Sequence, residues 1–403
     1  MTEAPETDDL PGHPAEVFSA FLKLGLTSFG GPIAHLGYFR DELVTRRGWL
    51  SDQAYADLVA LCQFLPGPAS SQVGFALGLM RAGWLGALAA FIAFTLPSAL
   101  ILLVFALSAS AFSAGPIGAG ALSGLKIVAV AIVAQAVWGM ARSLCPDRER
   151  ASIAVAAVAM LAFIPGTFGM VGAIGTGAIA GLFLGRGAGQ NIGGHVTLPI
   201  RRRHAVLCLA LFAALLGLLP LLAEHSDSLA VMNGFYRSGA LVFGGGHVVL
   251  PLLQAETVAS GWVSADAFLA GYGAAQAVPG PLFSFAAYLG ALLGPDPISL
   301  TGAGIALCAV FLPGFLILLG VLPFWDHFRT LATAQSLMQG ANAAVVGILG
   351  SALYSPVFTS AIGDAREFTL ALVCFALLVA WKLPPWVVVM LAALGGVGLS
   401  LTV

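Results

Sequence analysis

The chain has 403 residues, of which 59% are hydrophobic and only 9% are charged, and its mean hydropathy is +0.95. A soluble domain carries about 25% charged residues, so this composition excludes an ordinary soluble enzyme. The net charge is -2 and the longest basic stretch is three arginines at 201–203, which excludes a nucleic-acid binder. The composition predicts an all-α polytopic membrane protein, with the lipid bilayer as its surroundings.

The N-terminus and the cysteines point to no secreted or metal-dependent function. Residues 1–16 form an acidic N-terminal tail that lacks the basic region and short apolar core of a signal peptide. The first apolar segment is therefore expected to remain as a span. The five cysteines are odd in number and far apart, which supports neither a disulfide framework nor a metal site. We expect no cofactor.

Apolar segments of spanning length follow one another along the chain. A helix needs about 20 mostly apolar residues to cross a bilayer, and about thirteen segments approach that length. They are 17–37, 54–80, 84–109, 118–141, 151–167, 169–184, 205–223, 231–253, 265–293, 300–323, 334–356, 367–381 and 385–402. Basic loop residues favour a cytoplasmic N-terminus. The basic stretch 38–53 does not fit if every segment crosses, so the first two segments either cross or are re-entrant.

The sequence contains an internal duplication. Residues 23–31 (KLGLTSFGG) align with residues 237–245 (RSGALVFGG), and later GW, Q..PGP and LP motifs align in the same order. The chain thus divides into a first repeat at 17–184, a linker with one span at 185–230 and a second repeat at 231–403. With about six helical segments in each repeat, the single linker span is expected to invert the second repeat. Inverted repeats are typical of secondary transporters, whose substrate site lies where the halves meet.

Each repeat carries a glycine pair in the middle of an apolar segment. The first repeat has Phe29, Gly30, Gly31 and Pro32, and the second has a phenylalanine followed by Gly244, Gly245 and Gly246. Adjacent glycines and a proline break a helix and free backbone amides, which a half-helix N-terminus can offer to an anion. Close packing of helices through small residues is the alternative. Because the breaks match in both repeats, we favour an anion site.

A second matched motif follows in each repeat. It consists of Gln63, Pro66, Gly67, Pro68 and Ser70 in the first repeat, and of Gln276, Pro279, Gly280, Pro281 and Ser284 in the second. Two prolines around a glycine cannot continue a regular helix. The glutamine and serine side chains add neutral hydrogen-bonding groups beside the exposed amides, as in a substrate site. A structural kink, whose polar side chains satisfy loose carbonyls, is an equal alternative.

Ionisable residues within spans are costly and usually mark an ion pathway. Lys23 and Arg237 occupy equivalent positions before the two glycine pairs, and Lys126 lies one turn into its segment. These cations either bind an anion or snorkel to an interface. Asp57 is either a proton carrier or a residue at a helix start. His247 is a further site candidate that can titrate near neutral pH, and a satisfied core histidine is its alternative.

The paired FGG, GW, Q..PGP and LP motifs resemble the chromate ion transporter (CHR) family in its long, two-domain form. The resemblance covers nearly the whole chain. It implies duplicated membrane domains that export chromate from the cytoplasm across the bacterial inner (plasma) membrane and so confer chromate resistance. It also implies sulfate as the chemically similar oxyanion. Single-domain relatives in the family act as pairs, so the resemblance allows a homodimer.

The residues and the resemblance lead to one hypothesis about the site. Lys23, Lys126 and Arg237 supply positive charge to chromate, and the two kinds of break supply amides. Gly246 stands where the first repeat has Pro32, which predicts a looser turn in the second repeat.

The sequence also bears on the driving force and the direction of transport. No nucleotide-binding motif is present, so the membrane potential or a proton gradient is expected to drive export. A sulfate or other oxyanion transporter or channel that works as an importer is the alternative. The sequence shows no nucleophile or metal cluster that a membrane-embedded enzyme would need, so we expect no enzymatic activity.

Overall fold

The computed structural model describes residues 12–112, 115–184, 200–293, 299–325 and 331–402. These residues form helices and connecting turns, without a strand. Within this described part of the chain, six helical stretches are long and apolar enough to cross a membrane: Ala69–Ala109, Pro116–Leu144, Thr167–Leu184, Arg202–His225, Leu300–Phe324 and Ala332–Ala361. The all-α polytopic membrane architecture is therefore confirmed.

The first repeat begins with short helices and ends with long ones. Its elements are α1 (Pro14–Thr27), α2 (Gly31–Phe39), the π-helix η1 (Arg40–Arg46), α3 (Asp52–Phe64), α4 (Ala69–Phe112), α5 (Pro116–Leu144), α6 (Arg148–Phe163) and α7 (Thr167–Leu184). Helix α4 contains a break at Ala82 and Gly83, where the backbone leaves the helical conformation. The break between α1 and α2 falls at the FGG motif, as expected, with Gly30 before α2 and Gly31 as its first residue.

The second repeat follows α8 (Arg202–Leu222), which ends in the 3-10 turn η2 (Ala223–His225). Its elements are α9 (Asp227–Ala240), η3 (Gly246–Val248), α10 (Val249–Thr257), α11 (Ala265–Ala277), η4 (Leu282–Ser284), α12 (Phe285–Ala291), α13 (Leu300–Val321), η5 (Leu322–Phe324), α15 (Ala332–Ala352), η6 (Leu353–Phe358), α16 (Thr359–Ala361), α17 (Ala365–Val379) and α18 (Pro385–Leu401). The duplication is visible in local chemistry. Ser51 and Ser264 cap the equivalent helices α3 and α11 by accepting a hydrogen bond from the backbone amide three residues later.

In the first repeat the short helices turn back at the motif breaks. The Trp49 indole donates to a carboxylate oxygen of Glu16 at 3.1 Å, and Arg81 forms an ion pair with Glu16 at 3.2 Å. Glu16 lies at the start of α1, Trp49 lies just after η1, and Arg81 ends the first half of α4. The chain therefore enters along α1 and returns along α2 and η1, and then enters along α3 and returns along the first half of α4.

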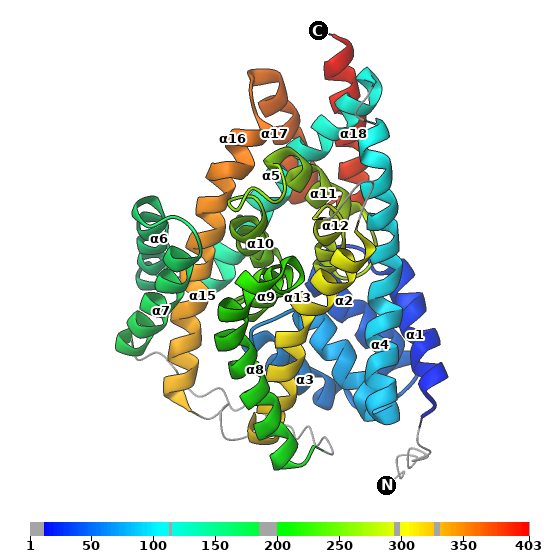
Figure 1. The fold of residues 1–403 in the computed structure, drawn as a ribbon, viewed down its shortest axis with the longest axis vertical. Helices are drawn as coiled ribbons and strands as arrows, with labels where there is room; N and C mark the ends of the chain where they lie inside the picture. Colours follow the sequence, from blue (N-terminus) through cyan, green and yellow to red (C-terminus); the bar gives the residue numbers. More distant parts are fainter. Residues whose placement is uncertain (1–11, 113–114, 185–199, 294–298, 326–330, 403) are drawn as a thin grey trace.

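The second repeat folds in the same way. Arg237 of α9 forms an ion pair with Glu256 of α10 at 2.6 Å, so these helices run back along each other. The Tyr288 hydroxyl of α12 donates to the carbonyl of Ala267, near the start of α11, at 2.9 Å. Both pairs of short helices thus turn at the motif breaks. In Figure 1, α1 and α3 occupy the lower half of the molecule, while α11 and α12 occupy the upper half.

The short helices are too short to cross a bilayer singly. Helix α1 has 14 residues, and a helix of that length spans about 21 Å, against about 30 Å for the hydrocarbon core. Of the two alternatives for segments 17–37 and 54–80, the structure favours re-entrant arms over complete crossings. The same holds for 231–253 and 265–293.

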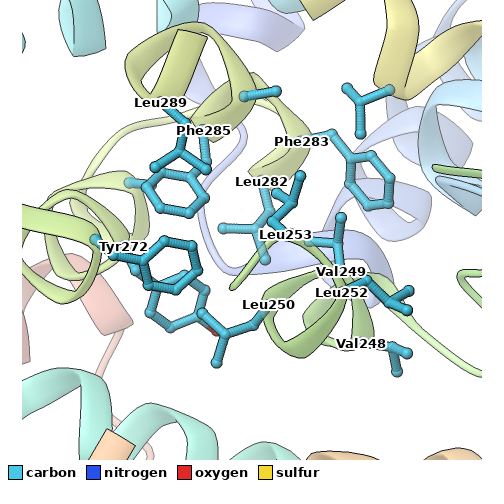
Figure 2. Packing of buried hydrophobic residues seen from close by; sticks show 14 of the residues in the cluster. Val248, Val249, Leu250, Leu252, Leu253, Tyr272, Leu282, Phe283, Phe285 and Leu289 are labelled. Carbon is cyan, nitrogen blue, oxygen red and sulfur yellow. The ribbon is translucent and has the colours of Figure 1, made fainter. Parts of the chain in front are cut away.

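A continuous apolar core supports the turning points of the second repeat. Figure 2 shows side chains of η3, α10, α11, η4 and α12 packed together, among them Leu250, Tyr272 and Phe285. Tyr272 and Phe285 are fully buried, and their ring centroids lie 5.9 Å apart. This packing fixes the backbone on either side of the second PGP turn.

Candidate functional site

The breaks of the two repeats are joined by two equivalent backbone hydrogen bonds. The amide of Gly67, in the first PGP turn, donates to the carbonyl of Val242, beside the second FGG motif, at 2.8 Å. Conversely, the amide of Gly280, in the second PGP turn, donates to the carbonyl of Ser28, beside the first FGG motif, at 2.9 Å. Each PGP turn therefore binds the FGG break of the other repeat.

The repeats also meet at Pro32 and Gly246, which occupy equivalent positions in the duplication. A Cβ atom placed on Gly246 would lie 2.8 Å from Cγ of Pro32. The second break, between Ala240 and Val249, is longer than the first, between Thr27 and Gly31, in agreement with the expectation of a looser turn, and Gly246 makes room there for the proline of the other repeat. A proline at both positions would not fit.

A small cavity lies at this crossing and is lined by Gly30, Gly31, Gln276, Gly280 and apolar neighbours. The side-chain nitrogen Nε2 of Gln276 is buried and makes no hydrogen bond of standard geometry among the described residues, and the Gln276 side chain interacts with the Tyr272 hydroxyl. A Cβ atom on Gly31 would meet nothing within 4 Å. No side chain caps α2 at Gly30, so the amide of Gly31 remains available to an anion, whereas Pro32 has no N–H to offer.

The PGP turns are held by groups within the protein. The backbone of Gly67 has φ +118° and that of Gly280 has φ +103°, a region that favours glycine. The Gln72 side chain donates to the carbonyls of Pro66 and Gly314 at 3.0 and 2.8 Å. Gln72 was missed from the sequence because the second repeat has no glutamine at the equivalent position.

The serines that follow the PGP turns make local contacts. The Ser284 hydroxyl donates to the carbonyl of Pro281 at 2.7 Å, and the Ser70 hydroxyl lies 3.4 Å from Nδ1 of His35. Pro68 packs against Gly314, and Pro279 and Pro281 are buried. Gln63 is exposed and does not line the cavity, unlike its equivalent Gln276. These contacts fit the kink interpretation for the serines and prolines and the site interpretation for Gln276.

The three cations all have carboxylate partners. Lys23 binds Glu42 at 2.7 Å, and Arg237 binds Glu256 at 2.6 Å. Both pairs join residues 19 positions apart at equivalent places in the two repeats. Sequence reasoning missed both glutamates, although their identical spacing from the cations was visible. The charge of each cation is therefore largely compensated, and its role in anion binding remains a prediction.

The remaining candidates lie away from the central cavity. Lys126 binds Asp266 of the second repeat at 3.0 Å. Asp266 precedes Gln276 by ten residues of α11, or about 15 Å of helix. Arg237 lines an open pocket of about 410 Å³ together with Asn233, Glu256 and Trp262. The structure does not bring Lys23, Lys126 and Arg237 together at the breaks.

His247 and the remaining residues of the two FGG motifs lie close to other side chains of the protein. Nδ1 of His247 lies 2.8 Å from the Tyr272 hydroxyl, which fits the interpretation of a satisfied histidine. The Phe29 ring lies 6.1 Å from Trp386 of α18. A Cβ atom on Gly244 would lie 3.4 Å from Oδ1 of Asn342, and one on Gly245 would lie 3.9 Å from Sδ of Met140. The second FGG break therefore faces α5 and α15.

Glu42 lies at the centre of a cluster of ion pairs and binds Lys23, Arg46 and Arg47. Burial opposes its ionisation, but the hydrogen bonds from Lys23 and Arg47 and the charges of Lys23 and Arg46 outweigh burial. The pKa of Glu42 therefore lies below its ordinary value of 4.5. A carboxyl group with a lowered pKa stabilises the folded protein above its ordinary pKa, and this stability is lost as the pH falls through the lowered value.

Replacement of Glu42 by glutamine is expected to lower the melting temperature near neutral pH. The difference from the unmodified protein should shrink as the pH falls below about 4.5, because protonation then removes the same charge. Thermal melts in detergent across this range provide the measurement. Asp41→Asn, at an exposed neighbouring carboxylate, is the control and should show a smaller difference. A Glu42→Gln deficit that stays constant with pH would contradict the ion-pair explanation.

These features define a class of protein. The chain is a helical membrane protein of two related repeats whose broken segments cross, which is the architecture of secondary transporters with a site at the repeat interface. The family model described as chromate transporter matches residues 15–182 and 229–397, once in each repeat. The chain therefore belongs to the chromate transporter family.

Individual relatives agree over nearly the full length. The chromate transport protein of Pseudomonas aeruginosa is 30% identical over 395 residues, which cover 95% of this chain and 91% of the relative. A probable chromate transport protein of Synechococcus elongatus is 28% identical and covers 96% of both chains. The Bacillus subtilis uncharacterized transporter YwrA matches only 28% of this chain, at 35% identity, with 65% of its own length. No solved structure matches the chain.

Proposed function

We propose that this chain exports chromate from the cytoplasm and binds it where the broken segments of the two repeats cross. The observation that carries the proposal is the pair of reciprocal hydrogen bonds from Gly67 to Val242 and from Gly280 to Ser28. These bonds couple each PGP turn to the opposite FGG break. A movement of one repeat against the other must therefore rearrange both breaks together, as alternating access requires.

The chemistry of the crossing suits a tetrahedral dianion. The amide of Gly31, at the start of α2, and Nε2 of Gln276 are hydrogen-bond donors beside one cavity. Charge-assisted hydrogen bonds to such donors are short and strong. The cavity holds about 10 Å³ in this conformation, room for at most one water. We infer that the structure represents a closed state, and that chromate enters when the repeats separate on one side.

The distribution of basic residues supports an inverted orientation of the repeats. With re-entrant arms, the stretch 38–53 lies on the same side as the N-terminus. If the second half of α4 and helices α5 to α8 then cross in turn, a single side receives most of the described basic loop residues. These are Arg40, Arg46, Arg47, Arg81, Arg142, Arg148, Arg150, Arg201, Arg202, Arg203 and Lys382, against Arg366 on the other side. This distribution satisfies the positive-inside rule with a cytoplasmic N-terminus.

The membrane potential favours export of such an anion. Each charge that crosses gains about 2.3 kcal/mol per 100 mV, and a negative interior drives a dianion outward. The two ion pairs then lie near opposite faces, Lys23 with Glu42 inside and Arg237 with Glu256 outside. We propose that these two ion pairs lie at the two ends of the transport pathway.

Uptake of radiolabelled chromate by everted membrane vesicles tests the proposed function. Vesicles that contain the protein should accumulate chromate when energised with an inside-positive potential, and vesicles without it should not. Excess sulfate should compete if the site recognises oxyanions by shape and charge. Uptake by intact cells, with none by everted vesicles, would instead identify an importer.

A further inference from the structure

Asp57 of α3 is a buried carboxyl group without a partner. Its side chain is completely inaccessible to solvent, and neither carboxylate oxygen accepts a hydrogen bond from any described residue. It lies five residues into α3, which begins at Asp52, so the interpretation as a helix-start residue is wrong. An ionised carboxylate in such a place is strongly unfavourable, whereas the protonated form is tolerated.

No neighbouring element supplies a free charge to Asp57. Helix α3 packs against α4 and η1, and the charged or titratable groups of these elements, of α3 itself and of α2 are Arg81, Arg40, Asp41, Glu42, Arg46, Asp52, Tyr55, Cys62, His35 and Tyr38. Arg40 binds Asp52, Arg81 binds Glu16, and Arg46 binds Glu42. The described residues also contain no group of three or more histidines, cysteines or carboxylates that could hold a metal ion.

Further unpaired polar groups lie in the same region of the first repeat. The hydroxyls of Ser28, Ser71 and Thr95 are buried without a hydrogen-bond partner, and the buried His35 imidazole interacts with the backbone of Ser28. The Ser28 carbonyl is the acceptor for Gly280 at the crossing. Unpaired buried polar groups are rare in proteins and call for a specific explanation. A route for protons between Asp57 and the crossing is such an explanation.

The second repeat lacks this arrangement. The position equivalent to Asp57 is Ala270, which is buried, and the position equivalent to Thr95 is Phe311. Of the polar set only Ser71 has a polar equivalent, Ser284. The carboxyl group of Asp57 is therefore not needed to build the repeated fold, which points to a task that the two halves do not share.

We propose that Asp57 is the proton-binding residue that couples transport to the proton gradient, and that it holds one proton in the state described here. This inference rests on the proposed function. The carboxylate takes up one proton to give the neutral acid and releases it when the repeats move and water reaches α3. Asp57 is then ionised only in the conformation in which water reaches α3.

Asp57→Asn tests the proposal because asparagine has the shape of the protonated acid and cannot release a proton. In proteoliposomes the variant should lose the stimulation of chromate flux by a pH gradient and should keep chromate self-exchange without a gradient. Asp52→Asn is the matched control, since Asp52 lies on the same helix, is exposed and pairs with Arg40. It should keep both activities. Chromate has the same protonation state in the experiments with both variants, so a difference between the variants reports on Asp57.

Infrared spectroscopy supplies a readout that is independent of chromate. The purified protein and Asp52→Asn should show the C=O band of a buried protonated carboxyl group, and Asp57→Asn should lack it. Asp57→Ala, which copies Ala270, serves if the asparagine variant does not fold. A full pH-gradient response in either Asp57 variant, or absence of the band from the unmodified protein, would overturn the proposal. Failure of the unmodified protein to move chromate while Asp57→Asn alone lacks the band would overturn the proposed function only.

Discussion

Replacement of Gln276 by glutamate is expected to abolish chromate transport while the protein remains folded. Nε2 of Gln276 is a donor beside the central cavity, and the substitution replaces it with a carboxyl group that becomes negatively charged when the cavity opens to water and chromate. Two unit charges about 4 Å apart repel by about 4 kcal/mol at the effective dielectric constant of a protein. That energy corresponds to roughly a thousandfold loss of affinity.

The control for this variant is Gln63→Glu. Gln63 is the equivalent residue of the first repeat, but it is exposed and does not line the cavity. Chromate uptake by everted vesicles should fall to background for Gln276→Glu and stay close to the unmodified level for Gln63→Glu. Equal losses in the two variants would contradict the assignment of the site to the cavity at Gln276.

Gly67→Ala is expected to have the largest effect on stability. The backbone of Gly67 has φ +118°, and a Cβ atom there would lie 2.9 Å from Cα of Gly314. A left-handed conformation costs a non-glycine residue about 1–2 kcal/mol, and overpacking adds about 1–3 kcal/mol. The amide of Gly67 also makes one of the two bonds between the repeats. A lower melting temperature and a loss of transport should therefore occur together.

Gly48→Ala separates the cost of the backbone conformation from the cost of overpacking. Gly48 also has a positive φ, +60°, but a Cβ atom there meets nothing within 4 Å. This variant should be destabilised only by the cost of the left-handed backbone, and it should keep transport. If thermal melts show equal losses for Gly48→Ala and Gly67→Ala, contact between the repeats at Gly67 adds nothing to stability.

The sequence was sufficient to predict the repeats and the positions of their breaks. Both follow from local chemistry, because Gly30, Gly31 and the PGP motifs interrupt helices whatever surrounds them. The pairing of each PGP turn with the opposite FGG break could not be predicted in this way. That pairing depends on the three-dimensional arrangement of the repeats, which no spacing along the chain records.

The ion pairs were missed for a different reason. Glu42 lies in the basic stretch 38–53, which hydropathy places in a loop, so no partner for Lys23 was sought there. Hydropathy measures the length of an apolar segment and not its direction, and two short arms therefore looked like one span. Once α2 and η1 are seen to return along α1, the partnership of Lys23 with Glu42 follows.

Labelling of cysteines from the two sides of the membrane tests the central claim, the inversion of two re-entrant repeats, most directly. In a background without native cysteines, Asp41→Cys and Ser260→Cys place one thiol beside each outer end of the arms, and both positions are exposed. We predict that an impermeant maleimide labels position 41 only from the cytoplasmic side and position 260 only from the opposite side. Labelling of both positions from the same side would contradict the account.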